Sequence, residues 1–182
     1  MAGHEATKRN FEEELPSSAA ADEEPPLKLE QFLPYQLNIA ATLASQAMSR
    51  VYTGRYKMGI PEWRVLVTLG ELGWMNGKAI CSQTFMHKTK VSRAIAMLER
   101  RKLVVRRTNH ADMRETLVAL TAAGRAIYAD LAPRAAAFSR QLTEVLTPSD
   151  REIFHRALKQ ITDGCARIVA QAIAQDGRIE EP

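Results

Sequence analysis

The spacing of apolar residues predicts a helix near each end of the chain. From Phe32 onward, apolar residues recur at steps of three and four: Leu37, Ala40, Ala41, Ala44, Met48, Val51 and Tyr52. This period puts them on one helical face that is suited to burial. A second series alternates steps of four and three: Phe154, Leu158, Ile161, Cys165, Ile168 and Ala172. Such a 3.5-residue period is typical of a helix packed lengthwise on another helix.

The middle of the chain predicts two short helices joined by a tight turn, over residues 79–85 and 88–101. In the second helix, Val91, Ile95 and Leu98 share one face, which we expect to lie in the core. The opposite face carries small and cationic residues: Lys88, Thr89, Lys90, Ser92, Arg93 and Ala96. Residues of these types suit close approach to a DNA groove, whereas bulky apolar residues would not.

The hydrophobic period then changes to two. Residues 103–107 and 115–120 read as paired strands joined by a polar loop. A helix-turn-helix followed directly by such a hairpin is a winged helix-turn-helix, so the predicted fold is mainly α with a small β-hairpin wing. Ahead of this unit, Pro61 suits the first turn of another helix, and Asn76-Gly77 predicts a turn.

Two helix starts follow the hairpin. Thr121 is expected to cap a helix that runs to about Leu142 and that Pro133 should kink or break. Thr147 is expected to cap the last helix, with Asp150 favoured near its N-terminus. The predicted organisation is a disordered acidic arm (1–30), an N-terminal dimerisation helix (31–58), a DNA-binding lobe (59–121), C-terminal dimerisation helices (122–174) and a flexible tail (175–182).

The net charge of +4 is distributed unevenly along the chain. Residues 1–30 carry eight acidic and three basic side chains and few large apolar ones, a composition typical of disorder. Residues 78–125 carry eleven basic and three acidic side chains. Such a concentration indicates a surface for a polyanion, although charge alone would fit a solvated face equally well. The helical and strand periods described above favour a DNA-binding surface over a solvated charged face.

Several classes of protein are disfavoured. The chain has no apolar run long enough to span a membrane and no secretory signal, so we expect a cytoplasmic protein without a membrane partner. Cys81 and Cys165 lie far apart and form no CxxC pair, so we expect no disulfide or zinc site and two inert thiols. The histidines are scattered and no catalytic motif appears, so we expect no enzymatic activity, no cofactor and no metal.

Several segments resemble the MarR family of winged helix-turn-helix transcriptional regulators. HKTKVSRAIAMLE (87–99) is similar to the family's recognition helix, and IPEWRVL (60–66) is similar to its second helix. LVVRR, DMRET and LTAAG, between residues 103 and 124, are similar to its wing and the start of the next helix. The likeness covers about residues 32–173. It implies an obligate homodimer with intertwined terminal helices that binds an inverted-repeat operator, as a repressor by family habit.

The resemblance also implies a set of DNA-binding residues: Lys88, Thr89, Lys90, Ser92, Arg93, Arg106, Asp112 and Arg114. Lys88 and Thr89, at the helix N-terminus, are expected to contact phosphates. Arg93 is the candidate for reading guanine in the major groove. Arg114 suits a narrow minor groove, and Asp112 is expected to brace the wing by pairing with a nearby arginine.

Two positions depart from the family pattern. His87 stands where the family often has Asp, so we expect a weaker cap and a softer or pH-sensitive helix start. Lys102 stands where the family often has Gly, and a left-handed conformation there would cost roughly 1 kcal/mol.

Members of this family commonly respond to small aromatic acids or related ligands bound between the dimer region and the winged lobe. The candidate pocket residues are Met48, Arg50, Tyr52, Trp63, Arg64 and Phe85, with Arg50, Arg55 and Arg64 as alternative partners for a carboxylate. The resemblance favours a phenolic acid or its CoA thioester. Aromatic and Met residues at helical spacing are more often plain core, and that alternative stays open. No cysteine occurs in residues 32–58, so redox sensing is disfavoured.

Two other functions remain as alternatives. A sequence-neutral architectural DNA-binding protein needs the basic patch but no residue that reads bases. A winged helix that binds only protein partners is disfavoured by the cationic face of residues 88–101.

Overall fold

A computed structural model describes residues 27–109 and 112–176. The chain divides into two units, residues 1–38 and 39–182. The described part of the first unit holds a single turn of 3-10 helix, η1 (Leu29–Gln31), and the first residues of α1 (Leu33–Tyr56). Most of the predicted acidic arm, residues 1–26, and of the predicted tail, residues 177–182, lies outside the described residues.

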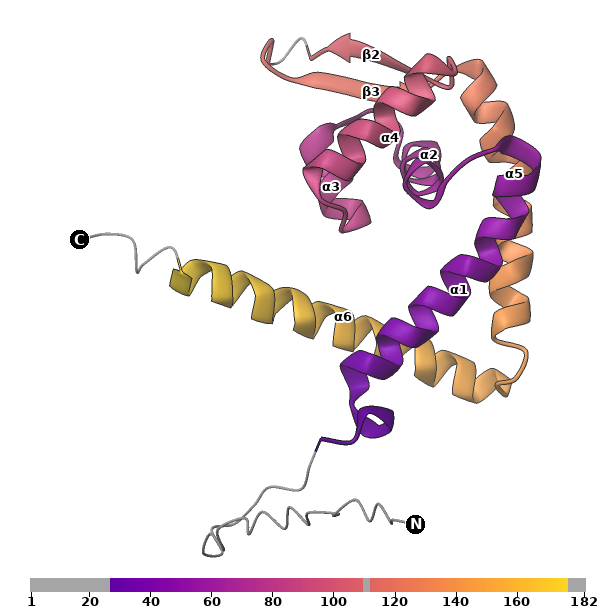
Figure 1. Cartoon of the computed structure of the whole chain (residues 1–182), viewed down its shortest axis with the longest axis vertical. Coiled ribbons are helices and arrows are strands. Elements are labelled where there is room, and N and C mark those ends of the chain that lie inside the picture. The colour runs from indigo at the N-terminus through magenta and orange to yellow at the C-terminus, as the bar shows by residue number, and fades with distance from the viewer. Residues whose placement is uncertain (1–26, 110–111, 177–182) are drawn as a thin grey trace, which may run out of the picture. The chain divides into compact units, whose positions relative to one another are not determined.

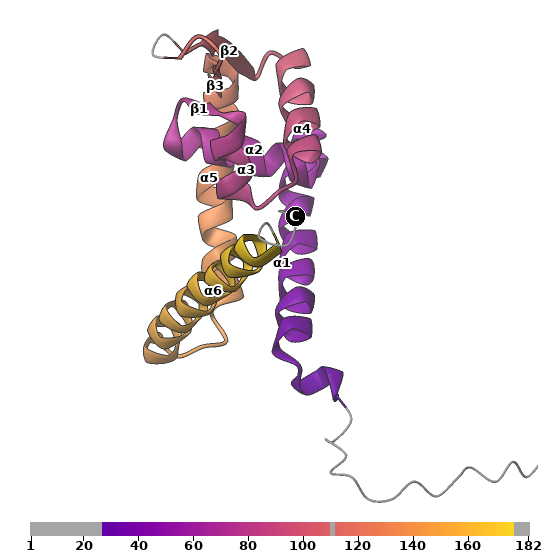
Figure 2. The same ribbon diagram turned by 90° about the vertical axis from the view of Figure 1, so that its left-hand side faces the viewer.

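The second unit carries α1 from Ile39 onward and then all remaining elements (Figures 1 and 2). These are α2 (Ile60–Leu72), β1 (Met75–Asn76), α3 (Gly77–Thr84), α4 (Lys88–Arg100), β2 (Val104–Thr108), β3 (Thr116–Leu120), α5 (Ala122–Leu142) and α6 (Pro148–Asp176). The architecture is a mainly helical winged helix-turn-helix, which confirms the predicted fold class.

The wing is a sheet of three antiparallel strands in the order β1-β3-β2. Val104 pairs with Leu120 at one end of the hairpin, as the period of two predicts. The third strand is a correction, because Asn76 was predicted to lie in a turn and instead pairs with Leu117. The Asn76 side chain accepts a hydrogen bond from the backbone N–H of Ala79 at 2.7 Å and so caps α3.

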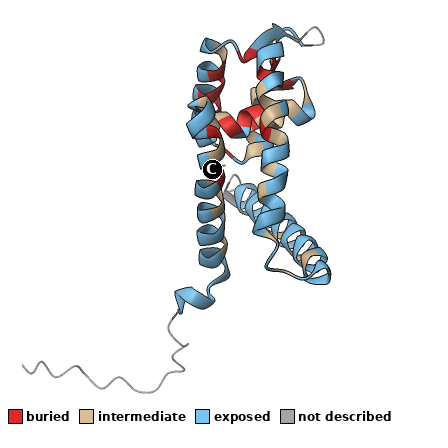
Figure 3. Cartoon of the chain, turned by 90° about the vertical axis from the view of Figure 1, so that its right-hand side faces the viewer, coloured by how far each residue is buried: buried red, intermediate tan, exposed pale blue. Residues whose placement is uncertain are grey.

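The core of the lobe lies between α2, α4 and the inner face of the sheet (Figure 3). On α4, one face is buried: Val91, Ala94, Ile95 and Leu98. These residues belong to the same core cluster as Val65, Leu66 and Leu69 of α2. Full burial of each large apolar side chain contributes about 1.5–3 kcal/mol, so this face fixes how α4 is rotated about its axis.

Both ends of α4 show the features that the sequence singled out. His87 caps the helix through its Nδ1 atom, which accepts a hydrogen bond from the backbone N–H of Thr89 at a long 3.3 Å. Lys102 has a φ of 57° and so does adopt the left-handed conformation whose cost the sequence raised as a condition. The N–H groups of Lys102 and Leu103 donate to the carbonyls of Glu99 and Leu98, a Schellman motif that turns the chain from α4 into β2.

The starts of α5 and α6 follow the predicted capping pattern. The hydroxyl of Thr121 accepts from the N–H of Gly124 at 3.1 Å, and that of Thr147 accepts from the N–H of Asp150 at 3.2 Å. Gly124 lies so close to the carbonyl of Leu103 that a side chain there would collide with it. Of the predicted kink or break at Pro133, the break does not occur, because α5 runs unbroken past it. A proline inside a helix costs about 3 kcal/mol or more, and burial of neighbouring residues such as Leu131 offsets that cost here.

Two helices leave apolar side chains uncovered within one chain (Figure 3). On α1, the predicted buried stripe is realised only at Met48 and Tyr52, while Ala40 and Ala41 are exposed. On α6, no residue from Pro148 to Gln175 is buried, and Ile168 is 67% exposed. In the described part of the chain, no helix combines the length and apolar character needed to cross a membrane.

Candidate nucleic-acid interface and ligand groove

The exposed face of α4 carries the predicted DNA-binding residues Lys88, Thr89, Lys90, Ser92 and Arg93, all of which are exposed. They lie opposite the buried face because successive helical residues are about 100° apart. Within the described part of the chain, Lys88, Lys90 and Arg93 form no salt bridge. Their charges are therefore available to an external anion.

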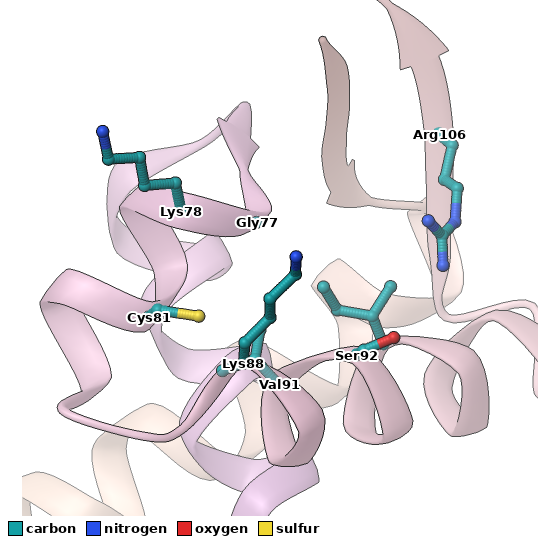
Figure 4. Close-up of a pocket in the computed structure, with 8 residues that line it drawn as sticks. Gly77, Lys78, Cys81, Lys88, Val91, Ser92 and Arg106 are labelled. Atoms are coloured by element: carbon teal, nitrogen blue, oxygen red, sulfur yellow. The ribbon is translucent and has the colours of Figure 1, made fainter.

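A groove of about 500 Å³ hollows this surface between α3, α4 and β2 (Figure 4). We call it the cationic groove. Lys78, Lys88 and Arg106 line it from three different elements, around the apolar side chains of Val91 and Ile95. Cations that converge on one hollow strengthen the local positive potential. Sequence reasoning missed Lys78, because its place in the first turn of α3 depends on the cap at Asn76.

Arg106 already has an anionic partner in this structure. Its Nε atom lies 2.9 and 3.0 Å from the two carboxylate oxygens of Glu99 on α4. Both side chains are 41% exposed, so this ion pair contributes at most about 1 kcal/mol. Arg106 can therefore exchange Glu99 for a phosphate at little cost.

The wing tip is braced differently from the prediction. Asp112 accepts a hydrogen bond from the backbone N–H of Arg114 at 3.0 Å, whereas the described residues show no ion pair of Asp112 with an arginine. Glu115 supports the loop end of the hairpin, since its carboxylate accepts from the side-chain amides of Asn76 and Asn109. Arg114 is exposed beside this turn.

A second, smaller groove of about 220 Å³ lies between α1 and α2, and we call it the aromatic groove. It is lined by Ala44, Ser45, Met48, Tyr52, Ile60, Trp63 and Arg64, which include four of the six predicted pocket residues. The rings of Tyr52 and Trp63 stack with centroids 5.1 Å apart. Burial raises the pKa of Tyr52, and the nearby Arg64 cation opposes that rise. The groove thus combines an aromatic wall with one cation.

The other two predicted pocket residues do not reach the aromatic groove. Arg50 is exposed and lies outside its lining. Phe85 ends α3 in a left-handed conformation and is 80% exposed in the turn before α4. Cys81 lines the cationic groove, and Cys165 is exposed on α6. Among the described residues, no cluster of three or more His, Cys, Asp or Glu side chains is arranged to hold a metal ion.

Comparison with known proteins identifies the DNA-binding domain. Residues 58–124 match a family model described as a winged helix DNA-binding domain. The structure of a MarR-family transcriptional regulator from Silicibacter pomeroyi DSS-3 is 26% identical with a TM-score of 0.67, covering 76% of this chain and 98% of that chain. The chain therefore carries a winged helix DNA-binding domain and is similar over most of its length to MarR-family transcriptional regulators. It is a DNA-binding transcriptional regulator and not an enzyme.

Two further similar structures are of proteins associated with small aromatic acids. BpsR from Bordetella bronchiseptica, whose DNA binding is regulated by 6-hydroxynicotinic acid, is 22% identical with a TM-score of 0.69, covering 76% of this chain and 99% of that chain. NadR, solved in complex with 4-hydroxyphenylacetate, is 20% identical with a TM-score of 0.65, covering 76% of this chain and 97% of that chain. None of the curated proteins matches this chain.

The pairing of Arg106 with Glu99 gives a testable prediction for this winged helix protein. Glu99→Gln should raise its affinity for duplex DNA about two- to fivefold, because an exposed ion pair no longer has to be broken. If Arg106 then neutralises a phosphate, the slope of log affinity against log salt should steepen by about 0.9 per contact. Fluorescence anisotropy on one duplex over a salt series measures both.

The control is the double variant Glu99→Gln with Arg106→Gln, which should lose the steeper slope. An unchanged affinity and slope in Glu99→Gln would show that Arg106 does not reach DNA.

Proposed function

We propose that this protein is a homodimeric repressor that binds an inverted-repeat operator and leaves it when a single-ring aromatic acid binds. The observation that carries the proposal is the exposed face of α4, where Lys88, Lys90 and Arg93 are unpaired among the described residues and where Lys88 also lines the cationic groove. A sequence-neutral architectural protein would share the charge but would not need a base-reading residue.

The α4 side chains divide into positioning and reading roles. Lys88 and Thr89 lie at the N-terminus of the helix, where backbone N–H groups and the helix dipole favour phosphate. Arg93 lies one turn further along and has the planar donor pair that matches guanine O6 and N7. Arg114 on the wing suits the adjacent minor groove, and Arg106 suits a flanking phosphate.

The dimer is inferred from apolar side chains that one chain leaves uncovered. On α6, Phe154, Leu158 and Ile168 are exposed along the helix, and Leu43 on α1 is also exposed. Large apolar surfaces left exposed on a soluble protein commonly mark sites of protein–protein contact. A second copy supplies the same kind of surface, and a two-fold axis would place two recognition helices about one turn of DNA apart.

The aromatic groove supports a single-ring acid as the effector. BpsR and NadR are associated with 6-hydroxynicotinic acid and 4-hydroxyphenylacetate, each a hydroxylated ring bearing a carboxylate. Here the Tyr52–Trp63 stack would face the ring, and Arg64 would pair with the carboxylate. A volume of about 220 Å³ is below the roughly 300–1,000 Å³ of drug-sized sites, so most of a CoA thioester would remain outside.

Footprinting tests DNA recognition directly. On the intergenic DNA upstream of its own gene, the wild-type protein should protect a discrete palindromic segment. Arg93→Ala should weaken binding to that segment by about 1–3 kcal/mol and should weaken binding to random duplex much less. Uniform coating by the wild type would favour the architectural alternative, and equal losses on both duplexes would rule out base reading by Arg93.

Sedimentation tests the dimer. Ile168→Glu puts a charge into the exposed apolar face of α6 and should convert the protein to a monomer that keeps its winged lobe but loses operator binding, because burying an unpaired charge is costly. Ala170→Glu, two residues further along the same helix and exposed on its other side, is the matched control and should remain dimeric. Identical sedimentation of both variants would contradict the proposed interface.

Fluorescence tests the effector site, since the protein has two tryptophans and Trp74→Phe leaves only Trp63. We expect 6-hydroxynicotinic acid or 4-hydroxyphenylacetate to change the Trp63 emission. Arg64→Gln should weaken that binding about tenfold or more, the usual loss for a hydrogen bond to a charged group. Arg50→Gln, outside the groove, is the matched control. Equal affinities of the Arg64 and Arg50 variants would place the carboxylate elsewhere, and a response only to CoA thioesters would contradict a single-ring effector.

A further inference from the structure

A polar junction joins the end of α1 to α5. The carboxylate of Asp130 on α5 accepts a hydrogen bond from the hydroxyl of Tyr56 at 2.8 Å. It also forms ion pairs with Arg55 at 3.2 Å and Arg134 at 3.4 Å. The Tyr56 hydrogen bond is the largest of the effects that hold the pKa of Asp130 below its ordinary value. The carboxylate therefore stays ionised at neutral pH and anchors Tyr56 to α5.

The same tyrosine also holds the recognition helix. Arg101, which directly follows the last residue of α4, donates from its guanidinium to the backbone carbonyl of Tyr56 at 2.7 Å. The two residues are 45 positions apart in the sequence. Carbonyls in the last turn of a helix lack partners within the helix, and a guanidinium is a strong donor to them. Tyr56 is thus held by α5 through its side chain and by α4 through its backbone.

The junction lies one helical turn from the aromatic groove. Tyr52, which lines that groove, precedes Tyr56 by four residues on α1 and so lies on the same face of the helix. After Tyr56, the chain turns at Lys57 in a left-handed conformation and buries Met58 in the core. A shift of α1 at the groove would therefore move the carbonyl that Arg101 binds.

We propose that the Tyr56–Arg101 contact is a positioning contact that sets how accurately α4 fits its operator. It rests on the proposed function, because it presumes that α4 reads bases. The N-terminal end of α4 faces DNA, while its C-terminal end is tied through Tyr56 to α1 and α5. Loss of the Tyr56–Arg101 contact lets α4 shift relative to the bases, so contacts that need accurate placement weaken more than contacts to phosphate.

The test compares specific with random binding. Tyr56→Phe removes the hydroxyl without changing any charge, and Arg101→Ala removes the donor to the carbonyl. Each variant should bind the footprinted duplex about tenfold more weakly, as expected for one lost charge-assisted hydrogen bond, while Tyr56→Phe binds a random duplex of equal length like the wild type. Because both changes break one chain of contacts, the double variant should lose little more than either single variant.

Arg100→Ala is the matched control, since Arg100 is the neighbouring exposed cation and, among the described residues, its guanidinium donates a hydrogen bond only to the Met97 sulfur. It should keep the wild-type ratio of specific to random affinity. A variant that was merely less stable would lose both affinities together and leave this ratio unchanged. If Arg101 acted only on phosphate, both affinities would fall, the salt slope would decrease by about 0.9, and Tyr56→Phe would have no effect.

The outcomes separate the two proposals. A wild-type footprint with unchanged specific-to-random ratios in Tyr56→Phe and Arg101→Ala would overturn the positioning contact and leave the proposed function intact. Absence of any discrete wild-type footprint would overturn the proposed function, and the positioning contact with it. Amide hydrogen exchange of α4 gives a readout that needs no DNA. We expect faster exchange near Met97 in Tyr56→Phe, and unchanged exchange would contradict the positioning contact.

Discussion

Burial of one face of α4 is the constraint on which the rest of the lobe depends. Val91, Ala94, Ile95 and Leu98 are buried, and the residues between them are exposed. A rotation of the helix by one residue, about 100°, would carry Lys90 and Arg93 into the core in one direction and Glu99 in the other. An isolated charge there would cost several kcal/mol or more. Packing against α2 therefore also fixes which side chains are offered to DNA, before any DNA is present.

The regular parts of this arrangement could be predicted from sequence because they have a period or a capping residue. The apolar face of α4, the β2–β3 hairpin and the caps at Thr121 and Thr147 are all of this kind. The strand β1 could not be predicted, since two residues show no period and their partners in β3 lie about forty residues away. The unbroken α5 shows the opposite case, in which tertiary context outweighs a local signal at Pro133.

The same reasoning explains which pocket residues the structure brings together. Met48 and Tyr52 are four residues apart and share a face of α1, so both reach the aromatic groove. Arg50 lies midway between them and points about 200° away from each on an ideal helix. Phe85 follows α3 in a left-handed conformation, where the helical period no longer applies. The ion pair of Arg106 with Glu99 could not be predicted either. The sequence shows that β2 follows α4, but it does not show which of their side chains meet.

A small coupling energy is enough to join the two grooves. Allosteric coupling between sites is typically about 1–3 kcal/mol, which changes an affinity by about 5–150-fold. One hydrogen bond to a charged group is worth about the same. An effector that binds beside Tyr52 therefore need not unfold or rebuild the winged lobe. It needs only to favour a position of α1 in which the Tyr56 carbonyl no longer meets Arg101, since a ligand shifts an equilibrium by its difference in affinity for the two positions. The cations on α4 would keep their attraction for phosphate in both positions and would lose only their register on the bases.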